Sequence, residues 1–143
     1  MTPFLTIDDL DLIDKSVFVR ADINTPVDPI TKQIIEKNRI NEATATISDL
    51  HASKVIVGSH QGRVGRYDFI SLEQHRAALE ETLKRPVKFI DDVFGPKARE
   101  EIQKLEKGEI LLLNNLRISS EENMEFSPKD AANTMFVQKL NKL

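Results

Sequence analysis

Several polar side chains directly follow short apolar runs of the sequence, and their chemistry suits a small anion. An arginine can hold a phosphate through two hydrogen bonds, which a lysine does less well. A histidine can donate to the same phosphate, and protonation strengthens that bond. Residues of these two types are His60, Arg63 and Arg117. An acid and an amide, Asp22 and Asn24, could reach a ligand's hydroxyl or carboxylate. The set predicts a site for a small anionic substrate.

Arg39 is a further candidate because it lies at the predicted start of a helix. A guanidinium there would add to the partial positive charge of the helix N-terminus. It could bind an anion, or it could stabilise charge on a phosphoryl group during transfer. The alternative is a solvated arginine that pairs with Glu36 or Glu42.

The other candidates also have purely structural interpretations. Asp22 and Asn24 could form a turn. His60 could cap a helix or lie in the core, and Arg117 could pair on the surface with a following glutamate. Spacing alone leaves these alternatives open, and the positions of the side chains in the folded protein decide between them.

The apolar runs are typical of short buried strands, and they cover residues 16–21, 54–58, 87–90 and 110–113. Between and after these runs lie segments whose apolar residues recur at helical spacing. These predicted helices cover residues 38–52, 71–85, 95–107 and 127–140. This alternation predicts an α/β protein, namely a Rossmann-like three-layer α/β/α domain with a parallel sheet of about four strands. Ligands bind such sheets beyond the carboxyl ends of the strands. The candidate side chains should therefore meet in one crevice.

Several local features refine the expected helices. Ser71 and Gln74 have the spacing of a capping box at the start of the second helix. His51 and His75 occupy positions that we interpret as solvent-facing. The last helix is expected to run unbroken from Ser127, with a buried side formed by Ala132, Met135, Phe136 and Leu140.

Composition restricts the class of protein. The chain has 143 residues, which suits one domain or part of one, and its net charge of -3 argues against a general nucleic-acid binder. It contains no cysteine, which excludes disulfides and thiolate metal sites. No apolar stretch is long enough to span a membrane, and the acidic N-terminal region does not suit a signal peptide. We therefore expect a cytoplasmic protein.

Two other kinds of site are not supported. Asp91 and Asp92 are adjacent, but no further clustered ligand accompanies them, so no metal site is predicted. The glycines after residue 58 match neither a Walker A loop nor a dinucleotide-binding motif.

The motifs together resemble the N-terminal domain of phosphoglycerate kinases, with features of the archaeal branch. The segments VRADINTP, NRI, SHQGR and LLLNNLR occur in the family's order and spacing. The match extends over nearly the whole chain, although Val64, Asn114 and Ile118 depart from the usual proline, glutamate and phenylalanine.

The resemblance implies a role for each candidate. Asp22 and Asn24 would contact the hydroxyl and carboxylate end of 3-phosphoglycerate. Arg39 would hold the carboxylate and act as the catalytic arginine by steadying the phosphoryl group. The substrate's own phosphate would be held by His60, Arg63 and Arg117.

The resemblance also implies a protein that is incomplete at its C-terminal end. Residues 1–143 would form the domain that binds 3-phosphoglycerate, while Mg-ATP would bind in a C-terminal domain that lies outside this sequence. We therefore expect no cofactor and no metal in the chain, and no enzymatic activity from it alone. The alternative function is a non-catalytic anion-binding or assembly module, which could self-associate through an exposed sheet edge.

Overall fold

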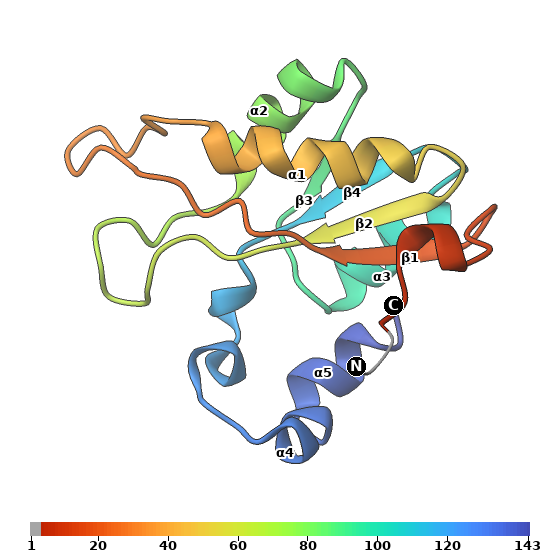
Figure 1. The fold of residues 1–143 in the computed structure, drawn as a ribbon. Helices are drawn as coiled ribbons and strands as arrows, with labels where there is room; N and C mark the ends of the chain where they lie inside the picture. The colour runs from red at the N-terminus through yellow and green to blue at the C-terminus, as the bar shows by residue number, and fades with distance from the viewer. Residues whose placement is uncertain (1–3) are drawn as a thin grey trace.

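A parallel sheet forms the centre of the molecule (Figure 1). The structure is a computed structural model that describes residues 4–143. Its 4-stranded sheet has the order β1-β2-β4-β3, with strands β1 (Ser16–Arg20), β2 (Lys54–Gly58), β3 (Lys88–Ile90) and β4 (Ile110–Leu113). The α-helices are α1 (Asn38–Asp49), α2 (Glu73–Leu83), α3 (Pro96–Lys104), α4 (Pro128–Ala132) and α5 (Met135–Leu140). Short 3-10 helices are η1 (Ile7–Asp9), η2 (Leu116–Ile118) and η3 (Ser120–Asn123). The predicted fold class is confirmed.

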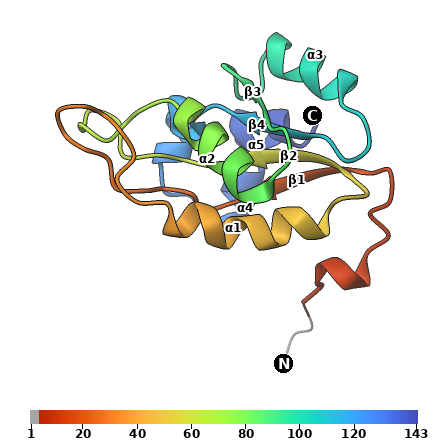
Figure 2. The same ribbon diagram turned by 90° about the horizontal axis from the view of Figure 1, so that it is seen from above.

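Helices cover both faces of the sheet because successive side chains of a strand point to opposite faces. Val55 and Val57 of β2 pack in the same cluster as α1 and α2, whereas Ile56 packs with α3. The chain moves outward from β1 to β3 and then returns to place β4 between β2 and β3. Right-handed crossovers put the returning helix on the opposite face. Figures 1 and 2 show α3 on the side away from α1 and α2.

The centre of the sheet is more deeply buried than its edges. All four residues of β4 are buried, and so are the last four of β2. At the edge, β1 alternates between exposed and half-buried residues, and Phe18 remains 39% exposed. Among the described residues, β1 pairs only with β2, so its outer edge has no strand partner.

The C-terminal region differs from the single helix that the sequence predicts. It forms α4 and α5, because Thr134 leaves helical geometry and caps α5 by accepting a hydrogen bond from the backbone N–H of Val137 at 3.2 Å. Glu121 also accepts from the N–H of Phe136 at 2.6 Å. Of the expected buried side, Phe136 is buried, whereas Met135 is 57% exposed.

Two expectations for α2 are wrong. Gln74 does not complete a capping box, since its side chain bonds to backbone groups of Lys32 and Ile34 in the loop after β1. His75 is fully buried rather than solvent-facing.

Among the described residues, no helix has the length and apolar character needed to cross a membrane.

The long loops after β1 and β2 lie side by side at the carboxyl ends of these strands in both views (Figures 1 and 2). The chain after β4 leaves the sheet at the same end. Three loops thus meet where ligands bind in parallel sheets.

Candidate functional site

One cavity of about 460 Å³ lies where the three loops meet. Its lining comes from the loop after β1, the loop after β2 and the segment after β4, and consists of Asn24, His60, Gly62, Arg63, Arg66, Asp68 and Arg117. Four of the six candidate residues predicted from the sequence therefore share a cavity. Three guanidinium groups and one imidazole make its lining rich in hydrogen-bond donors for an anion.

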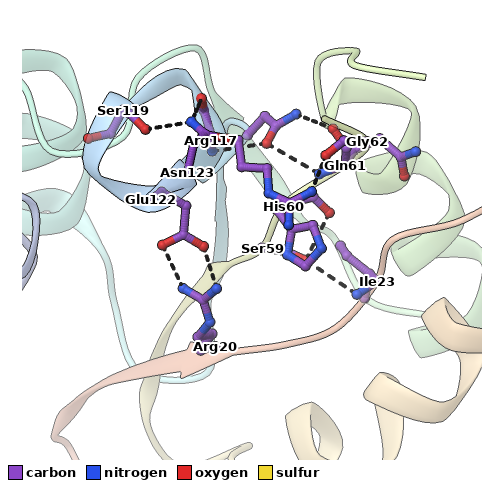
Figure 3. Close-up of polar contacts among 11 residues, drawn as sticks. Arg20, Ile23, Ser59, His60, Gln61, Gly62, Arg117, Ser119, Glu122 and Asn123 are labelled. Atoms are coloured by element: carbon purple, nitrogen blue, oxygen red, sulfur yellow. Dashed lines mark hydrogen bonds and ion pairs between the residues drawn. The ribbon is translucent and has the colours of Figure 1, made fainter. Parts of the chain in front are cut away.

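Arg117 is held toward the loop after β2 by its surroundings. Asn115 caps η2, and its side-chain oxygen accepts hydrogen bonds from the N–H of Arg117 at 3.1 Å and of Gln61 at 3.2 Å. The Arg117 guanidinium donates to the carbonyl of Gly62. Figure 3 shows Arg117 beside His60 at this junction. Arg117 is thus oriented by the loop rather than by a surface carboxylate.

The glutamates that follow Arg117 have other partners. Glu122 forms an ion pair with Arg20 at the end of β1, as Figure 3 shows. Glu121 accepts hydrogen bonds at the start of α5. The alternative in which Arg117 pairs with one of these glutamates is therefore wrong.

Gly62 occupies a position that only glycine fits. Its φ is +65°, and a Cβ there would lie 2.3 Å from the carbonyl oxygen of Asp68. Its N–H donates to the side-chain oxygen of Asn24 at 2.8 Å. Asn24 thus ties the loop after β1 to the loop after β2, in addition to lining the cavity.

Arg66 is a lining residue that the sequence reasoning missed. Its N–H donates to the carbonyl of Arg63 at 2.9 Å, and Gly65 between them has a φ of +83°. This is the geometry of a type II turn, which brings the α-carbons of its first and last residues within about 7 Å. The available signal was an arginine on each side of a glycine-containing turn.

Asp68 gives the cavity one carboxylate among its cationic side chains. Its Oδ1 is buried and has no hydrogen-bond partner among the described residues. A carboxylate in this place opposes part of the positive charge of the arginines, and it leaves the lining with a net positive balance.

His60 is half-buried, and neither caps a helix nor lies in the core. Burial lowers its pKa, the nearby charge of Arg117 lowers it further, and the carboxylate of Asp22 opposes the shift. The imidazole is therefore less readily protonated than a free histidine.

We expect an anion in the cavity to raise the pKa of His60, because a phosphate favours the imidazolium that donates to it. An NMR titration of the His60 ring protons with and without inorganic phosphate measures this change. The control uses the same concentration of chloride. A pKa that does not move, or that falls, would show that the phosphate lies elsewhere.

Asp22 and Arg39 lie in a separate, smaller cavity of about 240 Å³ beside β1 and α1. The Arg39 guanidinium bonds to the Asp22 carboxylate at 2.7 Å, and their side chains are 53% and 61% exposed. Arg39 is thus paired with neither Glu36 nor Glu42. The structure places these two candidates near the loops but not in the cavity of Arg117.

The pair Asp91 and Asp92 has structural roles. Asp92 accepts hydrogen bonds from the N–H groups of Val93, Gly95 and Ala98 at the start of α3, and this bonding lowers its pKa although burial acts against it. Asp91 accepts from Asn114 at 2.6 Å. Within residues 4–143, no cluster of three or more potential metal ligands occurs.

Comparison with solved structures defines the class of protein. The crystal structure of phosphoglycerate kinase from Pyrococcus horikoshii matches 97% of this chain and 34% of its own length, with a TM-score of 0.93 and 35% identity. The structure of phosphoglycerate kinase from Coxiella burnetii matches 99% of this chain and 33% of its own, with a TM-score of 0.74 and 26% identity. The fold is that of one part of these kinases.

Sequence comparison agrees. The phosphoglycerate kinase family model matches residues 7–143, and the chain therefore belongs to the phosphoglycerate kinase family. It is 49% identical over 140 residues to phosphoglycerate kinase from Methanobacterium bryantii, and 46% identical over 136 residues to that from Sulfurisphaera tokodaii. These matches cover 96% and 94% of the chain but 34% and 33% of the relatives. The chain thus spans about a third of their length, and the archaeal-type resemblance is confirmed.

Proposed function

We propose that residues 1–143 form the 3-phosphoglycerate-binding domain of a phosphoglycerate kinase. The observation that carries the proposal is the single cavity that collects His60, Arg63 and Arg117 at the carboxyl ends of the strands. These groups would hold the substrate's phosphate, which an arginine fork can bind with two hydrogen bonds. Arg66 lines the same cavity and adds a further guanidinium.

The other end of the substrate would contact Asp22, Asn24 and Arg39. Asn24 lines the phosphate cavity, whereas Arg39 is paired with Asp22 in the neighbouring cavity. Both partners of that pair are more than half exposed, and exposed pairs contribute little stability, so exchanging the Asp22 carboxylate for a substrate carboxylate costs little. Arg39 would then steady the phosphoryl group during its transfer between ATP and the substrate carboxylate in glycolysis or gluconeogenesis.

The complete reaction needs groups outside this chain. Phosphoryl transfer depends on positioning and on charge stabilisation more than on covalent chemistry. We propose that Mg-ATP binds in the part of the relatives that this chain does not match, and that a C-terminal nucleotide-binding domain closes over the cavity. The proposal also places the protein in the cytoplasm, where a glycolytic kinase would meet its substrate.

Binding can be tested apart from turnover. In an NMR titration with 3-phosphoglycerate, we expect chemical-shift changes at the amides of Asn24, Gly62 and Arg66, and none at Arg99 on α3. The purified chain should show no ATP-dependent turnover in the same buffer. Appreciable turnover, or a titration that leaves the cavity amides unchanged, would contradict the proposal.

The unpaired edge of β1 favours assembly as a second candidate function. An exposed edge strand offers unpaired backbone groups to another chain. Self-association through β1 should appear in sedimentation as a mass that increases with protein concentration. Alternate residues of β1 bond to β2, as the bonds at Lys15 and Ala21 show, so the N–H of Phe18 faces the free edge. Phe18→Pro should therefore suppress the self-association by removing that donor. A wild-type chain that stays monomeric at all concentrations would exclude this role. The comparison with the variant requires that the variant retains the wild-type fold.

A further inference from the structure

A buried polar cluster links the cavity loop to helix α2. It consists of Thr25 from the loop after β1, Gln61 from the loop after β2 and His75 from α2. Gln61 and His75 have no exposed surface. Gln61 stands between His60 and Gly62 in the chain, and both of these neighbours line the cavity. The cluster therefore lies directly behind part of the candidate site.

Every polar group of Gln61 is used. Its side-chain oxygen accepts from the N–H of Thr25 at 2.9 Å, and its side-chain nitrogen donates to the carbonyls of Thr25 at 2.9 Å and Asp68 at 3.3 Å. Its backbone N–H and carbonyl both bond to the side chain of Asn115, at 3.2 and 2.8 Å. The side chain and backbone of this one residue thus join the three loops that form the cavity.

These contacts fix the tautomer of His75. The Nε2 atom of His75 lies 3.0 Å from the Gln61 atom that accepts from the Thr25 N–H. A backbone N–H can only donate, so that Gln61 atom is the oxygen, and Nε2 of His75 must carry the proton. Exchanging the oxygen and nitrogen of the Gln61 side-chain amide would place its oxygen against the carbonyl oxygens of Thr25 and Asp68, where no hydrogen bond can form. The Nδ1 atom has no hydrogen-bond partner among the described residues.

We propose that His75 is a positioning residue for the anion site. Its Nε2–H fixes the amide of Gln61, and Gln61 in turn fixes the path of the loop from His60 to Arg63. Its effect on ligand affinity rests on the proposed function, whereas its effect on the loop does not. Burial lowers the pKa of His75 to about 4, although the backbone of Ile23 opposes the shift, so near neutral pH the ring carries the single proton that this role needs.

Three variants separate positioning from general stability. His75→Leu removes the donor and keeps apolar volume, while His75→Gln retains a side-chain N–H. Thr44→Val on α1 is the matched control, because Thr44 is also buried but its hydroxyl bonds to the carbonyl of Asn41 within the same helix. Hydrogen exchange of the Gly62 amide reports the loop, and NMR titration with 3-phosphoglycerate reports affinity.

In His75→Leu we expect faster exchange of the Gly62 amide, because Gln61 loses the donor that fixes its amide. We also expect a dissociation constant for 3-phosphoglycerate about tenfold higher, which corresponds to about 1.4 kcal/mol. His75→Gln should recover most of both losses. Thr44→Val should retain wild-type exchange and affinity.

The proposal is overturned if a folded His75→Leu keeps the wild-type exchange of Gly62, or if Thr44→Val changes the loop equally. If the wild-type chain does not bind 3-phosphoglycerate, the proposed function fails, and exchange at Gly62 alone decides the role of His75. If His75→Leu does not fold, the ring nitrogen signals of wild-type His75 decide. A proton on Nε2 supports the proposal, and a proton on Nδ1 overturns it.

Discussion

Replacing Arg117 by alanine is expected to weaken the binding of 3-phosphoglycerate by about ten- to a hundredfold. A hydrogen bond to a charged group contributes about 1.5–3 kcal/mol, which corresponds to that range in affinity. Arg63→Ala should have an effect of the same order, because Arg63 lines the same cavity. Isothermal titration calorimetry at constant salt measures both losses.

The control for this prediction is Arg99→Ala. Arg99 is exposed on α3, which covers the face of the sheet opposite α1 and α2, and its removal should leave the affinity unchanged. Equal losses in all three variants would mean that the anion is attracted by overall charge rather than bound in the cavity. Arg117→Lys adds a finer test, since it keeps the charge but loses the planar fork and should recover only part of the affinity.

Stability is expected to fall by about 3 kcal/mol between pH 6.5 and pH 4 because of His75. Burial lowers the pKa of His75 from 6.5 to about 4 in the folded protein. Above pH 6.5 both states are neutral, and His75 contributes no pH dependence. As the pH falls below 6.5 the unfolded state takes up the proton first, which favours unfolding. At about 1.4 kcal/mol per pKa unit, the gap corresponds to the stated loss.

Urea unfolding at a series of pH values tests this prediction. His75→Gln should flatten the curve in that window, because glutamine does not titrate. The lowered pKa of His60 acts in the same direction, so a smaller slope should remain in the variant. Carboxyl groups with lowered pKa values, such as Asp92 and Glu109, also destabilise the fold as the pH falls through their ordinary values of 3.8 and 4.5, at the acid end of this window. They act equally in wild type and variant, so the difference between the two curves reports His75. An identical slope in wild type and variant would contradict the assignment.

The sheet could be predicted from the sequence because its strands are continuous apolar runs between polar loops. The runs 54–58 and 110–113 coincide with β2 and β4, and the other two differ from β1 and β3 by one residue at an end. Central parallel strands are buried on both faces and therefore lack polar positions. Because the candidate residues directly follow the predicted strands, the sequence also predicts that they lie at the carboxyl ends of the sheet. Four of them share a cavity there.

The failures have local physical causes. His75 follows Leu72 by three residues and precedes Leu79 by four, so its spacing places it on the buried stripe of α2, whereas its polarity predicts exposure. The break at Thr134 depends on a cap that competes with an otherwise continuous apolar stripe. The separation of Arg39 from Arg117 depends on how two loops fold back, which residue spacing does not encode.

The bonding of Gln61 bears on how this loop could be reused in protein engineering. A short segment containing Ser59 to Asp68, transplanted onto another scaffold, would lose Thr25, His75 and Asn115, which together occupy most of the glutamine's bonding capacity. The transplanted segment would contain the arginines but not the hydrogen-bond partners that hold their loop in place. In its own protein the loop is already ordered before the ligand binds. The binding free energy of a phosphate therefore does not have to offset the entropy cost of ordering the loop.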